Sequence, residues 1–155
     1  MSLPSVDVLI VGAGAYGLSS AWWMAKRQSG ARILVVDEGE FASGASGRNG
    51  AGFRMQWGLE LNIRLCQESL RFFETAVDQL DYPQGLDLKQ DGYLVLAHSD
   101  KAFATLDSVL PTQHRLGVPS ELLYYPDENH WVLKPSNSVQ WYDTTLAWMN
   151  RWTRP

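Results

Sequence analysis

The six residues from Gly12 to Gly17 limit most strongly what this chain can fold into. They read Gly-Ala-Gly-Ala-Tyr-Gly and match the pattern G-x-G-x-x-G. An apolar, β-branched run at Asp7–Val11 precedes them and is typical of a buried parallel strand. A helical stretch at Leu18–Arg27 follows, and then a second apolar run at Ile33–Val36. The order strand, glycine turn, helix, strand predicts a βαβ unit that binds a dinucleotide.

Each position of this pattern has a physical role. Gly12 allows a tight turn, Gly14 lets the backbone approach a pyrophosphate, and Gly17 lets the helix pack closely on the strand. Around Ala15 and Tyr16 the helix N-terminus offers free N–H groups to an anion. The predicted cofactor contacts here are Gly12, Gly14, Ala15, Tyr16 and Gly17.

Two acidic residues, Asp37 and Glu38, follow the second predicted strand. Asp37 follows Gly17 in the sequence at about the separation, roughly 20 residues, that is typical of the acid that binds the ribose in this motif. We therefore predict that Asp37 and Glu38 contact the cofactor. An acid at this place repels a 2′-phosphate, which argues against NADP. The alternative is a glycine-rich turn that binds nothing.

A long glycine-rich loop, Glu40–Gly58, comes next, and loops of this kind are usually functional or disordered. Together with the first motif, its segment Phe41-Ala-Ser-Gly-Ala-Ser-Gly-Arg-Asn-Gly50 resembles the N-terminal region of FAD-dependent amine and amino-acid oxidoreductases, the D-amino-acid oxidase superfamily. The most similar branch is glycine oxidase, the sarcosine oxidase beta subunit and the L-proline dehydrogenase beta subunit. The resemblance extends from about Val6 to about Leu123 and includes Asp91–Ala97, which is similar to a strand that opens the family's substrate domain.

The resemblance implies FAD as the cofactor and roles for the loop. In this family the loop lies along FAD, so the resemblance assigns cofactor contacts to Ser43, Ser46, Arg48, Asn49 and Gly50. Small residues let the backbone reach a ligand, and an arginine can meet a phosphate with two hydrogen bonds. Some relatives attach FAD covalently through a histidine in this loop. No histidine lies between Phe41 and Gly58, so we expect non-covalent FAD. A flexible surface loop is the alternative.

Arg54 and Gln56 are the predicted substrate contacts. The stretch Arg54-Met-Gln-Trp-Gly58 resembles the place where sarcosine oxidase-like enzymes keep an arginine that binds the substrate carboxylate. A guanidinium group suits a planar carboxylate. An exposed loop arginine or a phosphate contact is the alternative. The implied reaction is oxidation of the C–N bond of an amine or amino acid by hydride transfer to flavin, and the catalytic residues are not identified.

The rest of the chain predicts further elements. Apolar spacing indicates a helix over Leu59–Leu80, and two strands, Leu86–Leu88 and Tyr93–Ala97, are expected to form a hairpin. A helix is expected over Asp100–Leu116, with Gly117 at its C-terminus. From about Tyr124 no period holds, so this tryptophan-rich tail is expected to be an irregular surface segment or lid, or a truncated or out-of-frame end.

The predicted fold class is α/β, an incomplete Rossmann-type FAD-binding βαβ unit followed by the start of an α+β substrate domain. The expected boundaries are residues 1–84, 85–123 and 124–155. Only two strands of the FAD domain are recognisable, whereas a doubly wound sheet has about six. We therefore expect an N-terminal fragment that is inactive by itself. The alternative is a non-catalytic dinucleotide-binding subunit or module that a partner chain completes.

Composition excludes several classes. The chain has 155 residues, 45% of them apolar, a net charge of −4 and one cysteine. These values argue against disorder, a disulfide scaffold and a nucleic-acid partner. We expect no membrane span, no signal peptide and a cytoplasmic location. His98, His114 and His130 share no ligand spacing, so no metal site is predicted, and no motif for hydrolysis is present.

Overall fold

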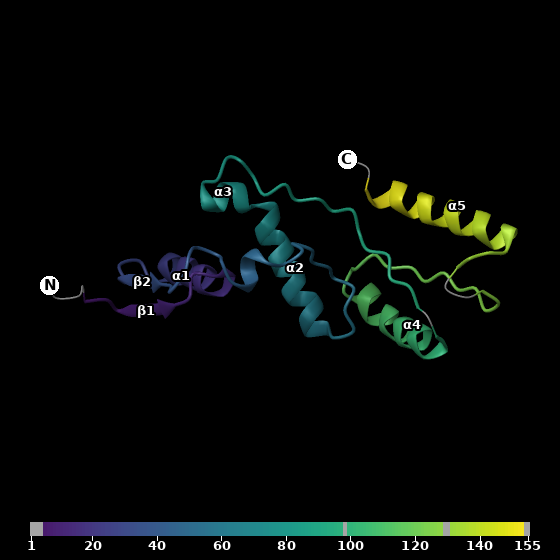
Figure 1. Ribbon diagram of the computed structural model, residues 1–155, viewed down its shortest axis with the longest axis horizontal. Coiled ribbons are helices and arrows are strands. Elements are labelled where there is room, and N and C mark those ends of the chain that lie inside the picture. Colours follow the sequence, from purple (N-terminus) through teal and green to yellow (C-terminus); the bar gives the residue numbers. More distant parts are fainter. Residues whose placement is uncertain (1–4, 98, 129–130, 154–155) are drawn as a thin grey trace. The chain divides into compact units, whose positions relative to one another are not determined.

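A computed structural model describes residues 5–97, 99–128 and 131–153 of the chain (Figure 1). Its packing divides the chain into two compact units, residues 1–52 and 53–155. The first unit holds the glycine motif and the part of the glycine-rich loop up to Gly52. The second unit holds Arg54 and the remaining helices. The domain boundaries expected from the sequence stay a prediction, because compact units need not coincide with functional domains.

The first unit contains the predicted strand–helix–strand arrangement, so the fold class is confirmed. Strand β1 (Val8–Val11) and strand β2 (Ile33–Val36) are parallel neighbours, with Val8 opposite Ile33 and Val11 opposite Val36. Helix α1 (Ala15–Arg27) connects them (Figure 1) and begins three residues before the predicted start. A two-pronged contact holds the strand ends together, because Arg32 donates to both carboxylate oxygens of Asp7, at 3.2 and 3.1 Å.

One face of the two-stranded sheet is covered by a helix, and the other is exposed to solvent. Helix α1 packs against both strands. Ile10 lies on that face, since its side chain approaches Gly17 of α1. The opposite face carries Leu9, Val11, Leu34 and Val36, and Val11 is 81% exposed. The prediction of fully buried strands is therefore wrong for this face. The run of apolar residues without alternation is typical of strands covered on both sides, and here one side is covered.

The second unit begins with two helices instead of the single predicted one. Helix α2 (Glu60–Glu74) is followed by a short helix α3 (Ala76–Leu80), with Thr75 between them. The Thr75 hydroxyl donates back to the carbonyl groups of Arg71 and Phe72, and this local bonding competes with a continuous helix. Among the described residues of this unit, the apolar side chains of Ile63, Ala76 and Val118 are essentially inaccessible to solvent and form its core.

Helix α4 (Asp100–Arg115) agrees with the prediction to within one residue. The Ser99 hydroxyl caps its start by accepting the N–H of Ala102. Gly117 has a positive φ of 73° at its end. The N–H groups of Gly117 and Val118 donate to the carbonyl groups of His114 and Gln113, which is the Schellman arrangement. The predicted C-terminal role of Gly117 is confirmed.

The predicted hairpin is wrong. Residues 86–97 contain no strand, although Gly92 takes the positive φ of 78° that a turn requires. Leu94, Val95 and Leu96 are about half exposed, so these apolar side chains find little to pack against. An isolated two-stranded hairpin is only marginally stable, because strands gain most from further strands or a helix on one face.

The described residues of the tail before Pro135 are irregular, as the sequence predicts, but the rest of the tail contains helix α5 (Pro135–Trp152) (Figure 1), which the sequence did not predict. Pro135 occupies the start of the helix, where its missing N–H costs nothing and its fixed φ is already helical. Trp141, Trp148 and Trp152 fall at spacings of seven and four residues, which matches one side of a helix. No single period holds over the whole tail because the described residues before Pro135 are not helical.

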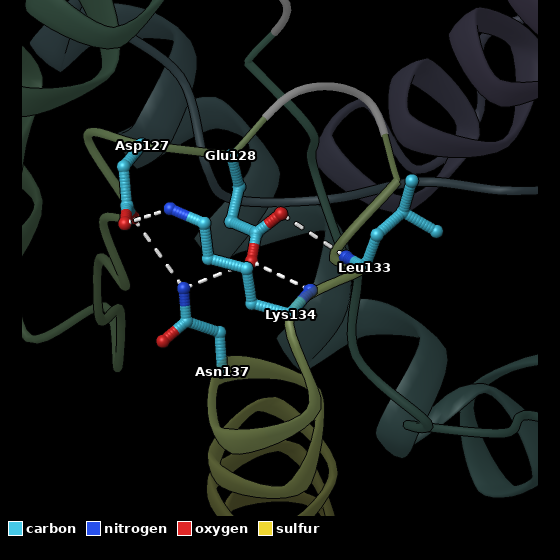
Figure 2. A network of polar contacts seen from close by, with 5 residues as sticks. All are labelled: Asp127, Glu128, Leu133, Lys134 and Asn137. Atoms are coloured by element: carbon cyan, nitrogen blue, oxygen red, sulfur yellow. Dashed lines mark hydrogen bonds and ion pairs between the residues drawn. The ribbon is translucent and has the colours of Figure 1, made fainter.

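Two acidic residues organise the start of α5 (Figure 2). The Glu128 carboxylate accepts the backbone N–H groups of Leu133 and Lys134, at 3.1 and 3.0 Å, and the side-chain amide of Asn137 at 2.9 Å. Asp127 pairs with the Lys134 ammonium group, and this hydrogen bond holds the pKa of Asp127 below its usual value. A carboxylate near the N-terminus stabilises a helix, because that end of the helix dipole is positive.

Among residues 5–97, 99–128 and 131–153, no helix combines the length and the apolar character that a membrane crossing requires.

Candidate functional site

The turn between β1 and α1 has the geometry that its glycines predict. Gly12 has a φ of 110°, in the region that residues with a side chain rarely adopt. A Cβ atom at Gly17 would lie 1.9 Å from the Gly12 carbonyl oxygen and 3.3 Å from a methyl group of Ile10. Gly17 therefore permits the close approach of helix and strand, as its place in the motif predicts.

The first turn of α1 is prepared for an oxygen acceptor. Its N-cap, Gly14, has no side chain to cap the helix, and the turn contains no acidic residue. The Ser46 hydroxyl fills this role from the following loop, because it accepts the N–H of Ala15 at 2.9 Å. A Cβ atom at Gly14 would lie 3.0 Å from the same hydroxyl oxygen. The structure thus brings Ser46, predicted from the second motif, to the glycine turn of the first.

Asp37 lies at the same turn. One carboxylate oxygen accepts the N–H of Ala13 at 2.6 Å, and the other accepts the N–H of Gly39 at 2.9 Å. These two backbone hydrogen bonds hold the pKa of Asp37 below its usual value. Each oxygen keeps a second lone pair, so Asp37 can still accept from the hydroxyl groups of a ribose. Ala13, which the sequence did not single out, is its partner in the turn.

The loop that follows is shaped by its own side chains. A short 3-10 helix, η1 (Ala45–Gly47), presents Ser46. Asn49 donates to the Ser46 carbonyl and accepts the N–H of Ala51 at 2.7 Å, so it braces the segment that carries the hydroxyl. The Ser43 hydroxyl lies close to Gly39. The structure therefore places Ser46 beside the turn at Ala15 and Ser43 near Gly39, while Asn49 supports Ser46 from within the loop.

Three predicted cofactor contacts are not drawn into this cluster. Glu38, Arg48 and Gly50 are exposed, and in the described part of the chain no hydrogen bond joins the side chain of Glu38 or Arg48 to the glycine turn. Arg48 directly follows η1, with its N–H bonded to Ala45. Arg48 follows Ser46 by two residues, and its long, always charged side chain suits a phosphate.

These residues fit a dinucleotide with a pyrophosphate. At the helix N-terminus, the Ala15 N–H already donates to an oxygen atom, that of Ser46. A close backbone approach is built in at Gly14, and an acid stands at the end of β2. Gly14, Ala15, Ser46 and Arg48 would hold the phosphates, and Asp37 the ribose.

The predicted substrate residues lie in the second unit. The Arg54 guanidinium carbon is 4.6 Å from the ring centre of Trp57 and 6.0 Å from that of Tyr93. Its Nε is buried and has no hydrogen-bond partner among the described residues, and no ion pair of Arg54 is found there. Gln56 is half-buried, and its side chain makes no contact with Arg54 that the described residues reveal.

Sequence reasoning missed the aromatic partners of Arg54. Trp57 donates from its indole N–H to the Arg54 carbonyl at 2.8 Å. Its place three residues after Arg54 was a signal available in the sequence, since a tryptophan so near an arginine is a ready stacking partner. Tyr93 comes from the segment that was assigned to a hairpin, and nothing local pointed to it.

No cluster of three histidine, cysteine, aspartate or glutamate residues that could hold a metal ion occurs in the part of the chain that the structure describes. His98 and His130 lie outside the described residues. His114 is described, and its Nε2 lies 2.8 Å from the Ser120 carbonyl oxygen.

The strand–helix–strand unit, the glycine turn and the acid at the end of β2 define a dinucleotide-binding protein of the Rossmann type. Comparison with protein families narrows this class. The family model described as FAD dependent oxidoreductase matches residues 7–146, which is about nine-tenths of the chain. The chain belongs to this family of FAD-dependent oxidoreductases.

The curated proteins of similar sequence are named as peptidases and not as oxidoreductases. The chain is 29% identical over 164 residues to a probable dipeptidyl-peptidase 5 from Aspergillus clavatus, covering 98% of this chain and 21% of that protein. It is 39% identical over 70 residues to dipeptidyl-peptidase 5 from Porphyromonas endodontalis, covering 43% and 10%. The chain thus spans about a fifth or less of the length of these relatives. They give no support for a glycine oxidase or sarcosine oxidase in particular.

Proposed function

We propose that this chain is the FAD-binding portion of an oxidoreductase that oxidises the C–N bond of a small amine or amino acid, in the manner of glycine oxidase or the sarcosine oxidase beta subunit. The main support for the proposal is a pair of hydrogen bonds at the glycine turn. Ser46 and Asp37, from two different segments, both meet backbone N–H groups of the turn at Ala13 and Ala15. The N–H groups of such a turn donate to oxygen atoms, and membership of an FAD-dependent family supports FAD as the ligand.

The roles of the residues follow from their chemistry. When bound, FAD would supply the acceptor for a hydride from the substrate carbon. Gly14 and Ala15 would bind the pyrophosphate through the backbone, with Ser46 beside them. Asp37 would accept hydrogen bonds from the ribose. Because the loop between Phe41 and Gly58 contains no histidine, the proposal includes a non-covalent cofactor.

Arg54 is the proposed receptor for a substrate carboxylate. Its guanidinium has no acidic partner in the described residues, so its charge is available to an anion. Planar carboxylates pair with a guanidinium through two parallel hydrogen bonds. This assignment favours an amino acid over a simple amine as substrate, with Gln56 as a second contact.

The alternative is a dinucleotide-binding module that a partner chain completes. The observation that favours it is the uncovered apolar face of Leu9, Val11, Leu34 and Val36. Under either proposal the 155-residue chain alone binds FAD weakly and oxidises no amine, because a two-stranded sheet with one bare face is a poor platform for a large cofactor.

Peptide hydrolysis, which the names of the relatives suggest, has no support in the residues. The serine in Gly44-Ala-Ser-Gly-Arg48 departs from the G-x-S-x-G motif at its last position. The Ser46 hydroxyl accepts an N–H group of α1, and no histidine is found beside it in the described residues.

The test is a titration of the ¹⁵N-labelled chain with FAD, followed by two-dimensional NMR, which detects weak binding. We expect saturable shifts of the amide signals from Ala13 to Gly17. Gly14→Val should abolish them. Gly44→Ala is the matched control, because Gly44 has open space around it and an ordinary φ of −83°. Equal shifts in Gly14→Val, or no response at these amides in the unmodified chain, would contradict the proposal. Release of all flavin on acid denaturation tests the non-covalent attachment.

A further inference from the structure

The segment that carries Arg54 is fixed to the second unit at both of its ends. On one side, the ring of Phe53 packs against Phe73 of α2, with 5.2 Å between ring centres. On the other side, the Trp57 carbonyl accepts the side-chain amide of Gln113 of α4 at 3.3 Å. Gln113 is 4% exposed, so this anchor lies in the interior. A five-residue segment held at both ends has little freedom left in its backbone.

Gly58 adds a close approach to the same helix. A Cβ atom at Gly58 would lie 3.0 Å from a methyl group of Val109 of α4. The absence of a side chain lets the backbone after Trp57 lie against α4. Two contacts therefore fix the position of Trp57. Gln113 donates a hydrogen bond to its carbonyl, and Gly58, the next residue, packs against α4.

Trp57 in turn meets Arg54 in two ways. Its indole N–H donates to the Arg54 carbonyl at 2.8 Å, and its ring lies 4.6 Å from the guanidinium carbon. A cation over the face of a tryptophan is attracted by the ring's quadrupole. The Arg54 Nε is buried beside it with no acceptor among the described residues. An arginine otherwise samples many rotamers, and stacking on a fixed ring restricts them.

We propose that Trp57 is a positioning residue that holds the Arg54 guanidinium against its indole ring, pre-ordered for a planar carboxylate. The inference rests on the proposed role of Arg54 in the preceding subsection. A pre-ordered receptor binds more tightly because less side-chain freedom is lost when the ligand arrives. Gln113 of α4 supports the arrangement from the interior, and Tyr93 supplies a second ring at 6.0 Å.

The experiment follows the Arg54 side chain by NMR in the labelled 155-residue chain, with its Nε–H signal assigned through Arg54→Lys. Sodium acetate is the probe, and acetamide is its uncharged counterpart. Trp57→Leu removes both contacts with Arg54. Trp57→Phe keeps a ring and removes the N–H donor. The matched control is Trp152→Leu, which removes a ring that lies 5.0 Å from the Arg151 guanidinium on α5. The amide signals of α4 report whether each variant keeps its fold.

The expected results separate the two proposals. Acetate, and not acetamide, should shift the Arg54 Nε–H signal in a saturable way. Trp57→Leu should weaken that response about threefold to thirtyfold and move the Arg54 side-chain signals out of the ring-current field, with a smaller loss in Trp57→Phe. Trp152→Leu should change neither.

Two results would overturn one proposal and spare the other. If acetate shifts Arg54 equally in the unmodified chain and in both Trp57 variants, the positioning role is refuted while the carboxylate role stands. If acetate has no effect on the unmodified chain, the carboxylate role of Arg54 fails. In that case the ring-current shifts still test whether Trp57 stacks on Arg54. Stacking is refuted if the Arg54 side-chain signals do not move in Trp57→Leu.

Discussion

Replacing Gly17 by alanine tests whether the first unit depends on the close contact between α1 and β1. The new methyl group would lie 1.9 Å from the Gly12 carbonyl oxygen, roughly 1.5 Å closer than an ordinary contact. The obstacle is backbone and cannot rotate away. Relief requires Gly12 to move, and Gly12 donates its N–H to the Val36 carbonyl at 2.7 Å, the bond that ties the turn to β2.

The expected cost follows from three effects. Overpacking of this kind costs about 3 kcal/mol, and loss of the Gly12 hydrogen bond costs about 1 kcal/mol more. Alanine is the better helix former by about 1 kcal/mol, which offsets part of the cost. The first unit should therefore lose about 3 kcal/mol of stability. Hydrogen exchange of the β1 amides measures it, and the expected acceleration is on the order of 100-fold.

Gly44→Ala serves as the comparison, because no atom lies within 4 Å of the Cβ position there. It should leave the exchange of the β1 amides nearly unchanged. Gly14→Ala should fall between the two, since the atom it meets at 3.0 Å is the Ser46 hydroxyl, which can rotate. Unchanged protection of β1 in Gly17→Ala would refute the reasoning, because the helix and strand could then not be as close as the structure has them.

Two further predictions concern a carboxylate and the core. The pKa of Asp37 is lowered from 3.8 by hydrogen bonds from the backbone N–H groups of Ala13 and Gly39. Its stabilising effect is thus complete above pH 3.8 and is lost as the pH falls through the lowered value. The protection factor of the Ala13 amide, which compares its exchange with that of an unfolded chain at the same pH, should therefore fall there, and Asp37→Asn should abolish this dependence. Ile63→Ala should lower the free energy of unfolding of the second unit by about 2–5 kcal/mol, because Ile63 is fully buried. Leu61→Ala, at 67% exposed, should change it by less than about 0.5 kcal/mol in urea denaturation followed by circular dichroism.

Features that depend on neighbours in the sequence were predictable. The glycine turn, the two strands and the C-terminus of α4 at Gly117 each follow from a few adjacent residues, and each is present. The contact between Ser46 and Ala15 joins residues 31 apart. Periodicity could not find it, and Ser46 was predicted through the family resemblance of its loop. The hydrogen bond between Gln113 and Trp57, across 56 residues, left no signal at all.

The failures have the same physical origin. The predicted hairpin at residues 86–97 has its turn glycine, but a strand depends on partners that a local pattern does not name. For α5 the error was the reverse, because a helix is present where the sequence predicted none. Its own signals were present, with Pro135 at the start and tryptophans at helical spacing, but the helix has no buried residue to mark one side as apolar. A helix whose start is held by the carboxylate of Glu128 is specified by polar contacts that hydrophobic spacing does not reveal.

The glycine turn reaches its shape through acceptors supplied by the chain itself. The Ser46 hydroxyl and the Asp37 carboxylate already bind the N–H groups of Ala15 and Ala13, so these donors are aimed at oxygen atoms in advance. A hydroxyl is a neutral acceptor, and a phosphate carries a negative charge that forms stronger hydrogen bonds and interacts with the helix dipole. If the turn binds the FAD pyrophosphate as proposed, a phosphate oxygen would therefore compete well with the Ser46 oxygen for the Ala15 N–H. Because the backbone donors of the turn already point at oxygen atoms, little of the binding free energy would be lost in ordering the turn itself.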